Sequence, residues 1–426
     1  MKIAFYTLGC KVNQYETNWL SEKAHERGFQ VVNHNEDADV YVVNSCTVTG
    51  ESDRKTRQIV RRFKRTHPES VLVLTGCMPQ AFPEDARKLI EADIVIGNKN
   101  NAVLFDCLDE YFKSCNRIVK IETHLKGDPF APCKIKDFEG RTRAIVKIED
   151  GCDRFCSYCI IPYSRGRVRS KDLIDLKEEF TALYNKGFSE VVLVGINLSS
   201  YGKDTGNSLC DVVELADKIG FKRIRLGSLE PDHITDEVID RLAKVKSFCP
   251  QFHISLQSGC NKTLKTMNRH YTAEEYYDLC VKLRKSFTDT SLTTDIMVGF
   301  PDENEEDFEE SVRFAEKVGF EKVHVFPYSP RQGTRAAKMK QIEKSVKEKR
   351  SHEMIQRTNI VRAEYLKNQI NKEVNVLFET RSTDGYTEGY TENYTPVKVK
   401  GNITCGEIIK VKITDVNGDF CIGEIK

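Results

Sequence analysis

The sequence predicts an α/β protein with three parts: an N-terminal doubly wound parallel sheet, a central partial (βα)6 barrel and a small all-β C-terminal barrel. Short apolar runs alternate with helical stretches up to about residue 125 and again from residue 141, and such alternation indicates parallel sheets. After residue 371 the pattern changes to short alternating runs separated by glycine turns. We therefore expect domains at 1–125, 141–370 and 371–426, with a linker at 126–140.

The N-terminal part contains four runs that we expect to form strands. They are Ile3–Thr7, Val40–Asn44, Val71–Thr75 and Ile94–Gly97, with helical stretches near Tyr15–Arg27, Glu51–Arg65 and Ala102–Phe112. Three cysteines, Cys10, Cys46 and Cys77, each follow the end of a different expected strand. Ligands of open α/β sheets bind at this edge, so the three thiolates can hold an iron–sulfur cluster there. The alternative is that each is an ordinary buried cysteine.

A second group, Cys152, Cys156 and Cys159, stands at C-x3-C-x2-C spacing on an expected loop. Three thiolates on one four-iron cube leave one iron without a protein ligand, which keeps a coordination position open for a small molecule. A zinc loop is the alternative, but zinc loops favour paired C-x2-C units with four ligands, and only Cys156 and Cys159 form such a pair. An accidental grouping is the remaining interpretation.

In the central part, the sequence pattern predicts six strands whose C-terminal ends carry polar or small residues. The strands are Ala144–Glu149, Val191–Gly195, Arg223–Leu226, Phe252–Leu256, Leu292–Val298 and Lys322–Phe326. In barrels of βα units the functional groups project from these ends. We expect a small-molecule pocket lined by Gly195, Asn197, Ser228, Glu230, Gln257 and Asp295. Turn and cap chemistry explains any single one of them equally well. A charged stretch from Lys340 to Asn371 predicts one long helix after this part.

Charge gives only local signals, because the net charge of the 426 residues is +1. The helix near residues 51–65 carries seven Lys/Arg against Glu51 and Asp53, and residues 141–171 carry eight Lys/Arg against three acidic residues. We interpret both as surfaces for a polyanion, with a solvated helix face as the alternative for the first. The segment 372–426 has seven basic and nine acidic residues, so it is a poor candidate for the main RNA anchor.

The N-terminus runs directly into an expected strand, and no apolar run approaches the ~20 residues that cross a bilayer. We expect a cytoplasmic protein with no membrane contact. Thiols stay reduced in that compartment, so clustered cysteines among the 15 favour metal binding or catalysis over disulfides.

Several motifs resemble the radical S-adenosylmethionine (SAM) methylthiotransferase family across nearly the whole chain. TLGCKVNQYET (Thr7–Thr17), NSCTVT (Asn44–Thr49) and TGC (Thr75–Cys77) resemble its N-terminal cluster-binding domain, and GCDRFCSYCIIPYSRGRVRS (Gly151–Ser170) resembles its radical-SAM loop. SLQSG, TDIMVGFPDENEEDF and HVFPYSPRQGT are further matches, although Gln332 stands where a proline commonly precedes the glycine. The C-terminal barrel resembles the family's TRAM domain, and the central part its radical-SAM barrel.

The resemblance implies two 4Fe-4S clusters and SAM as cofactors. Cys152, Cys156 and Cys159 would hold the cluster that cleaves SAM to a radical, and Cys10, Cys46 and Cys77 the cluster that delivers a methylated sulfur. The polar strand ends would then bind SAM. No acid–base catalytic residue is expected, because an aromatic C–H bond has no useful acidity. The implied partners are the anticodon stem-loop of tRNA, an electron donor such as a flavodoxin or ferredoxin, and a sulfur source.

The residues after Cys10 bear on the substrate. Lys-Val-Asn-Gln is most similar to the tRNA N6-threonylcarbamoyladenosine methylthiotransferases, whereas relatives acting on isopentenyladenosine typically read Gly-Cys-Gln-Met-Asn and those acting on a ribosomal protein Gly-Cys-Pro-Lys-Asn. The resemblance implies 2-methylthiolation of N6-threonylcarbamoyladenosine on the 3′ side of the anticodon. The alternatives are isopentenyladenosine of tRNA, a ribosomal protein, or a non-catalytic iron–sulfur RNA-binding protein.

Overall fold

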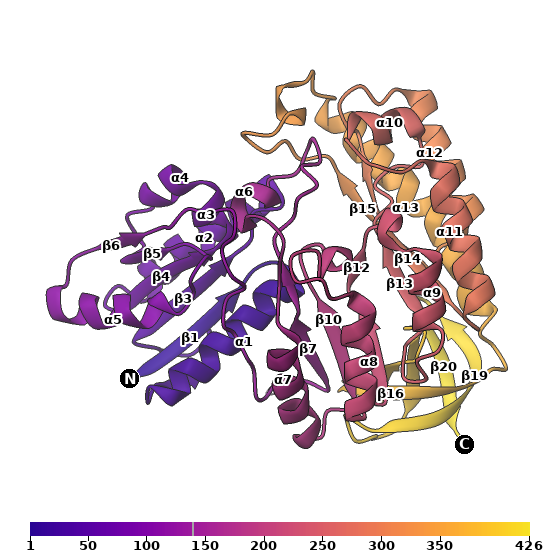
Figure 1. Cartoon of the computed structure of the whole chain (residues 1–426), viewed down its shortest axis with the longest axis horizontal. Helices are drawn as coiled ribbons and strands as arrows, with labels where there is room; N and C mark the ends of the chain where they lie inside the picture. The colour runs from indigo at the N-terminus through magenta and orange to yellow at the C-terminus, as the bar shows by residue number, and fades with distance from the viewer. Residues whose placement is uncertain (139) are drawn as a thin grey trace.

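The computed structural model, described here for residues 1–138 and 140–426, begins with a six-stranded parallel sheet in the order β2-β1-β3-β4-β5-β6 (Figure 1). Its strands are β1 (Lys2–Thr7), β2 (Gln30–Val32), β3 (Val40–Ser45), β4 (Val71–Gly76), β5 (Ile94–Ile96) and β6 (Ile118–Lys120). The helices are α1 (Lys11–Glu26), α2 (Gly50–Thr66), α3 (Cys77–Ala81), α4 (Pro83–Arg87) and α5 (Val103–Ser114). Because all six strands are parallel, every carboxyl end lies at one edge.

Helices cover both faces of this sheet, as the continuous apolar strands require. Val42 and Val73 face a core formed with α1 and α5, whereas Val43 and Leu74 face a second core formed with α2 and α4. The first core also takes in Ile145 of the next domain, so the N-terminal sheet is packed against the central part.

The central part is a partial barrel of parallel strands in two hydrogen-bonded groups. One is β11-β10-β7 and the other β12-β13-β14-β15, with bounds β7 (Arg143–Lys147), β10 (Glu190–Val194), β11 (Arg223–Leu226), β12 (Ser228–Leu229), β13 (Gln251–Ile254), β14 (Ser291–Val298) and β15 (Lys322–Pro327). Only Gly227 separates β11 from β12, so these two short strands occupy the position of one expected strand. The covering helices include α7 (Leu173–Asn185), α8 (Leu209–Ile219), α9 (Asp236–Leu242), α10 (Asn261–Thr266), α11 (Ala273–Ser286) and α12 (Glu305–Val318).

A short antiparallel pair, β8 (Glu149–Asp150) with β9 (Arg169–Ser170), closes the base of the excursion that carries the second cysteine group and α6 (Ile161–Arg165). The long helix α13 (Lys344–Lys367) then runs along β15 and leads to the last domain. That domain is a closed barrel of β16 (Glu373–Arg381), β17 (Tyr386–Tyr390), β18 (Pro396–Lys400), β19 (Ile408–Asn417) and β20 (Phe420–Ile425).

The C-terminal barrel docks on the amino ends of the central strands. Arg223 of β11 donates to the carbonyls of Tyr390 (3.0 Å) and Asn375 (2.6 Å). Arg225 donates to the carbonyls of Glu392 (3.1 Å) and Thr391 (3.3 Å). These four contacts reach main-chain carbonyls of the barrel, whereas Arg143 also contacts its side chains, pairing with Glu379 at 2.8 Å and donating to the Tyr394 hydroxyl at 3.1 Å.

The predicted fold class is confirmed in all three parts. The sequence prediction missed β2 and β6, which are three-residue edge strands, and the two-residue strands β8 and β9. The domain boundaries and the linker at 126–140 stay predictions. Across the described ranges 1–138 and 140–426, none of the helices combines the length and apolarity that a membrane crossing needs.

Candidate functional site

The N-terminal cysteine group lies at the carboxyl ends of three adjacent strands. Cys10 precedes α1 after β1, Cys46 follows β3, and Cys77 begins α3 directly after β4. Their loops pack tightly: Gly9 has a φ of +114°, and a Cβ there would lie 2.9 Å from the Cβ and 3.3 Å from the Sγ of Cys46. The structure thus brings Cys10, Cys46 and Cys77 to one edge, as the sequence predicts.

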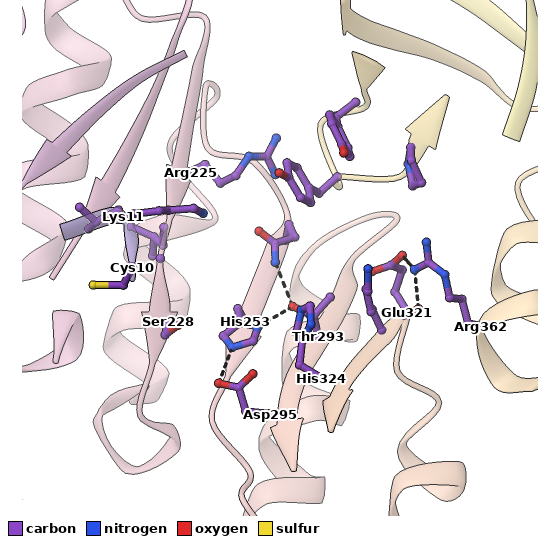
Figure 2. Close-up of a pocket in the computed structure, with 18 of the residues that line it drawn as sticks. Cys10, Lys11, Arg225, Ser228, His253, Thr293, Asp295, Glu321, His324 and Arg362 are labelled. Carbon is purple, nitrogen blue, oxygen red and sulfur yellow. Dashed lines mark hydrogen bonds and ion pairs between the residues drawn. The ribbon is translucent and has the colours of Figure 1, made fainter. Parts of the chain in front are cut away.

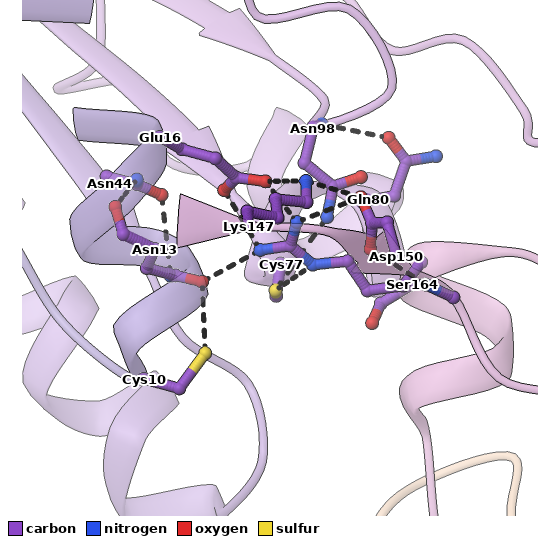
Figure 3. Close-up of polar contacts among 12 residues, drawn as sticks. Cys10, Asn13, Glu16, Asn44, Cys77, Gln80, Asn98, Lys147, Asp150 and Ser164 are labelled. Carbon is purple, nitrogen blue, oxygen red and sulfur yellow. Dashed lines mark hydrogen bonds and ion pairs between the residues drawn. The ribbon is translucent and has the colours of Figure 1, made fainter. Parts of the chain in front are cut away.

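Arg165 supports this group from the other domain. Its side chain is fully buried, and its Nε donates to the Sγ of Cys77 at 3.2 Å. Its Nη2 donates to Asn13 Oδ1 (2.8 Å) and to Glu16 Oε2 (3.0 Å). Figure 3 shows Asn13 and Glu16 beside Cys10 and Cys77, with Asn98 Nδ2 a further donor 3.7 Å from the Cys77 sulfur. An arginine from the cysteine-loop excursion is therefore part of the N-terminal site.

The same network continues through buried charges across the domain boundary. Lys147 donates to Glu16 (2.8 Å) and Asp150 (2.7 Å), and Arg169 lies 3.3 Å from Asp150. Burial alone would raise the pKa of Asp150, but Lys147, Arg165 and Arg169 hold this pKa well below its usual range. A buried network of this kind is costly to interrupt, because removing one partner leaves an uncompensated charge.

The second group, Cys152, Cys156 and Cys159, lies between β8 and α6. The loop is held by Ser157, whose backbone N–H donates to the carbonyl of Met267 (3.0 Å), and by a turn in which Cys159 N donates to the carbonyl of Cys156 (3.0 Å). Gly151 has a φ of +90°, and a side chain there would collide with the carbonyl of Arg167. The loop predicted from the sequence is therefore present, and these backbone contacts fix its conformation.

Donors face the sulfur atoms of this loop as well. Arg269 Nη1 lies 3.3 Å from Cys156 Sγ and Asn197 Nδ2 lies 3.6 Å from Cys152 Sγ. Burial raises the pKa of Cys152 and of Cys77 to about 12 each, so a metal group must displace the thiol protons when it binds. In each group N–H donors are directed at the sulfurs, which suits thiolate ligands, and the two sets of residues fit a 4Fe-4S cluster.

The described residues form no site for a single metal ion. Within residues 1–138 and 140–426, no three His, Cys, Asp or Glu side chains converge closely enough to hold one metal ion. Ligands of a cubane bind separate irons and do not need that convergence. The geometry therefore gives no support to the zinc-loop alternative.

A cavity of about 670 Å³ connects the parts of the molecule (Figure 2). Its lining comes from all three parts of the chain. The N-terminal domain contributes Cys10 and Lys11, the central strands contribute residues of their inner faces, and the C-terminal barrel contributes Tyr390 and Tyr394. Of the six predicted pocket residues, Gly195, Ser228 and Asp295 line this cavity. Their role in binding SAM stays a prediction.

The other three predicted pocket residues have different surroundings. Asn197 contacts Cys152, and Glu230 pairs with Arg269, which itself contacts Cys156. Gln257 has a φ of +67°, and its main chain links to Asp295 and Met297, each at 2.8 Å. Asn197 and Glu230 thus connect the strand ends to the cysteine loop.

The cavity is rich in polar groups. His253 lies 3.3 Å from Asp295 and 3.0 Å from Thr293, and Figure 2 shows His324 beside them. Lys11 points its nitrogen toward the interior and stays accessible from the cavity; partial desolvation by the surrounding protein, with the charges of Arg143 and Arg225, lowers the pKa of Lys11 to about 8.

Sequence reasoning missed Arg165, Arg269, Lys11 and Glu149 as site residues. Glu149 is buried and accepts the backbone N–H of Asn197 at 2.7 Å, and burial raises the pKa of its carboxyl. The signal for Arg165 was present, since it stands in the loop motif, but its partner lies in another domain.

The interpretation of residues 141–171 as a basic surface is wrong. Lys147, Arg165, Arg169 and Lys171 are buried, and Arg143 and Arg154 are paired with Glu379 and Asp232. Their charges neutralise internal carboxylates instead of facing solvent. Helix α2 is different, because Arg54, Lys55, Arg61, Arg62 and Arg65 are exposed.

Comparisons with known proteins agree with this geometry. Residues 146–315 match the family described as "Radical SAM superfamily", residues 2–97 "Uncharacterized protein family UPF0004" and residues 367–426 "TRAM domain". The chain is similar to the solved structure of the radical S-adenosylmethionine methyltransferase TsrM from Kitasatospora setae, with a TM-score of 0.54 and 12% identity over 77% of this chain and 73% of that one. This second likeness concerns the fold alone.

Together, the barrel, the three-cysteine loop and these matches define a radical-SAM enzyme. The chain is 38% identical over 420 residues to the Bacillus subtilis (strain 168) protein named "Threonylcarbamoyladenosine tRNA methylthiotransferase MtaB", covering 96% of this chain and 93% of the relative. A protein of that name from Aquifex aeolicus is 38% identical, covering 88% and 92%. The "tRNA-2-methylthio-N(6)-dimethylallyladenosine synthase" of Clostridium botulinum (strain Loch Maree / Type A3) is 34% identical, covering 98% and 95%.

The chain therefore belongs to the radical-SAM tRNA methylthiotransferase family. It is an enzyme that transfers a methylthio group to tRNA, and its cofactors are SAM and 4Fe-4S clusters, two in this family. The resemblance, the enzyme class and the cofactors predicted from the sequence are confirmed.

Proposed function

We propose that the enzyme converts N6-threonylcarbamoyladenosine, on the 3′ side of the tRNA anticodon, to its 2-methylthio derivative. The observation that carries this choice is the Lys-Val-Asn-Gln run after Cys10, which differs from the Gln-Met-Asn of relatives acting on isopentenyladenosine. Relatives named for threonylcarbamoyladenosine at 38% identity over most of their length support it. Dimethylallyladenosine, which is isopentenyladenosine, is the second candidate substrate, because a relative named as a synthase of its methylthio derivative is 34% identical.

We assign one cluster to each cysteine group. Cys152, Cys156 and Cys159 would hold the cluster that reductively cleaves SAM, and Cys10, Cys46 and Cys77 the cluster that carries the sulfur to be transferred. Support comes from the donors that face each group: Arg269 and Asn197 at the loop, and Arg165 and Asn98 at the N-terminal edge. Gly195, Asn197, Ser228, Glu230, Gln257 and Asp295 would bind SAM between the loop and the cavity.

The side chains of the cavity then have binding and orienting roles. Substitution at the adenine C2 carbon needs a radical, because that C–H bond is not acidic enough for a side-chain base. The cavity would hold the target base away from bulk water, with Cys10 at its wall. His253, fixed by Asp295 and Thr293, offers one orienting group.

We further propose that the exposed basic side chains of α2 contribute to tRNA binding, since phosphate contacts dominate such affinity. The enzyme would work in the cytoplasm, where its tRNA substrate is made, with a flavodoxin or ferredoxin as electron donor and a separate sulfur source. We place the domain limits at 1–125, 141–370 and 371–426, so that each cysteine group lies in its own domain.

The test is nucleoside analysis. Anaerobically reconstituted enzyme is incubated with SAM, reductant and two tRNAs, one carrying N6-threonylcarbamoyladenosine and one carrying isopentenyladenosine. We expect the 2-methylthio product from the first only. Product from the second only would select the dimethylallyl alternative. Failure to cleave SAM at all would favour a non-catalytic RNA-binding role.

A further inference from the structure

Four Lys or Arg side chains line the large cavity: Lys11, Arg225, Lys322 and Arg362. The two arginines are engaged. Arg225 binds Glu190 at 3.0 Å as well as carbonyls of the C-terminal barrel, and Arg362 binds Glu321 and, at 2.9 Å, Asp419. In the part of the chain that the structure describes, neither lysine ammonium has a hydrogen bond or an ion pair. The cavity therefore contains cationic groups that lack an anion.

Lys11 differs from Lys322 in its surroundings. Both side chains are exposed, and Lys322 begins the edge strand β15. Lys11 sits among the cations Arg143 and Arg225, and the nearby carboxylates are already paired: Glu190 with Arg225 at 3.0 Å, and Glu379 with Arg143 at 2.8 Å. An ammonium held near two guanidinium groups and without its own counterion is a site for an anionic ligand group.

The position of Lys11 relates this site to the reacting atom. It directly follows Cys10, and in Figure 2 the Cys10 sulfur and the Lys11 nitrogen point in opposite directions, the nitrogen toward the cavity interior. On adenine, C2 and the N6 substituent flank the same ring nitrogen. A base whose C2 faces the Cys10 side can therefore extend its N6 substituent along the cavity wall that Lys11 forms.

The two candidate nucleosides differ in that substituent. A threonylcarbamoyl group ends in a carboxylate, whereas a dimethylallyl group is a hydrocarbon. An ammonium–carboxylate contact is a charge-assisted hydrogen bond, and it strengthens where water is excluded. A hydrocarbon substituent packed against this lysine would instead displace water from the ammonium without supplying a partner, at a cost in free energy.

We propose that Lys11 binds the carboxylate of the threonylcarbamoyl group and selects this nucleoside over those with an uncharged N6 substituent. The inference rests on the proposed function, which it deepens by assigning a specificity residue. Lys11 acts on binding and orientation, and the chemical step does not involve it.

The experiment measures a ratio of affinities in one protein. Two fluorescent anticodon stem-loops, carrying N6-threonylcarbamoyladenosine or its carboxyl methyl ester, are titrated with reconstituted enzyme in the presence of SAM. The wild type should bind the free acid at least about tenfold more tightly, as a charge-assisted hydrogen bond of about 1.5–3 kcal/mol implies. Lys11→Gln should bind the two equally, and Lys11→Arg should retain most of the preference. Lys322→Gln, which removes the same charge from another part of the cavity wall, should keep it.

Each outcome decides a separate point. Because the readout is a ratio, a general loss of affinity in Lys11→Gln leaves it interpretable, and iron content and circular dichroism report folding. A preference that survives in Lys11→Gln, or disappears equally in Lys322→Gln, overturns the assignment. The assignment is also overturned if Lys11→Gln binds SAM more weakly but still prefers the free acid over the methyl ester. Lys11 would then bind the carboxylate of SAM. If the wild type makes 2-methylthio product only from isopentenyladenosine, the proposed function itself fails.

Discussion

The two groups of three cysteines are assembled in different ways. Cys152, Cys156 and Cys159 lie within eight consecutive residues, on a loop whose two ends are joined by the antiparallel pairing of β8 with β9. Cys10, Cys46 and Cys77 come from three separate strand ends, and Cys46 and Cys77 are buried. The loop site is thus a local structure, whereas the N-terminal site exists only when the parallel sheet has formed.

The supporting arginines sharpen this contrast. Arg269, which faces Cys156, belongs to the same domain as the loop. Arg165, which faces Cys77, belongs to a different domain from its cysteine. The N-terminal site therefore depends on domain docking and the loop site does not, and this difference can be tested.

The largest expected effect separates the two groups by function. Changing Cys10, Cys46 and Cys77 to Ala should remove about half of the iron expected for two 4Fe-4S clusters. Formation of 5′-deoxyadenosine from SAM should continue, but no methylthio product should form. Changing Cys152, Cys156 and Cys159 to Ala should abolish both. Iron analysis and chromatography of the same reactions are the measurements, and normal methylthiolation by the N-terminal variant would contradict the assignment.

A second expected effect concerns Arg165. In the background lacking the loop cysteines, Arg165→Met should destabilise the protein by about 3–5 kcal/mol, because the buried carboxylates Glu16 and Asp150 then lose one of the cations that balance them. The iron content of this variant, which the N-terminal cysteines alone would hold, should fall together with its stability. Arg269→Met, in the background lacking the N-terminal cysteines, is the matched comparison and should leave domain docking intact. Iron content and denaturant unfolding check both; equal stability losses would remove the distinction between the sites.

A third, smaller effect is expected on tRNA affinity. Reversing Arg62 and Arg65 to Glu on α2 should weaken tRNA binding and lower the slope of log affinity against log salt by about 0.7–0.9 for each phosphate that the helix no longer neutralises. Reversing the exposed Lys285 and Lys349, on α11 and α13, serves as the charge-matched control. A slope unchanged by the α2 reversal would exclude that helix from the RNA surface.

The smallest effect uses two histidines, one near each site. His124 bonds Asn98, the neighbour of Cys77, and His233 bonds Arg154 of the cysteine loop. Burial, with nearby cations, lowers the pKa of each to about 4. Since the unfolded value is about 6.5, both histidines favour the folded state above that pH, and this stability is lost as pH falls toward 4.

Unfolding of the metal-free protein by denaturant at pH 7 and pH 5 measures this loss. His124→Gln and His233→Gln should each reduce the difference in unfolding free energy between the two pH values. The double variant should reduce it further, since the two histidines lie in different parts of the molecule. A difference that neither substitution changes would mean that other groups set the acid sensitivity.

The sequence was sufficient for the fold class and for the placement of Cys10, Cys46 and Cys77 at one sheet edge, because strand–helix alternation is a local pattern. The role of the six cysteines as cluster ligands stays a prediction. It was insufficient for Arg165, whose partners Glu16 and Cys77 lie far away in the chain, and for Lys11, whose neighbouring charges come from other parts of the chain. Counting charge misjudged residues 141–171, because Lys147 and Arg169 neutralise buried carboxylates that the count places at the surface. Burial, which decides whether a charge faces RNA or an internal partner, follows from packing between domains.

The docking of the C-terminal barrel has a consequence for variation in this protein. Arg223 and Arg225 recognise carbonyl groups of Tyr390, Asn375, Glu392 and Thr391, and every amino acid supplies such a carbonyl. Sequence changes on the barrel that preserve its strand geometry should therefore leave these four contacts intact, whereas changes at Glu379 or Tyr394 would remove side-chain partners of Arg143. The outward face of this domain can therefore vary in sequence while Tyr390 and Tyr394 continue to line the cavity.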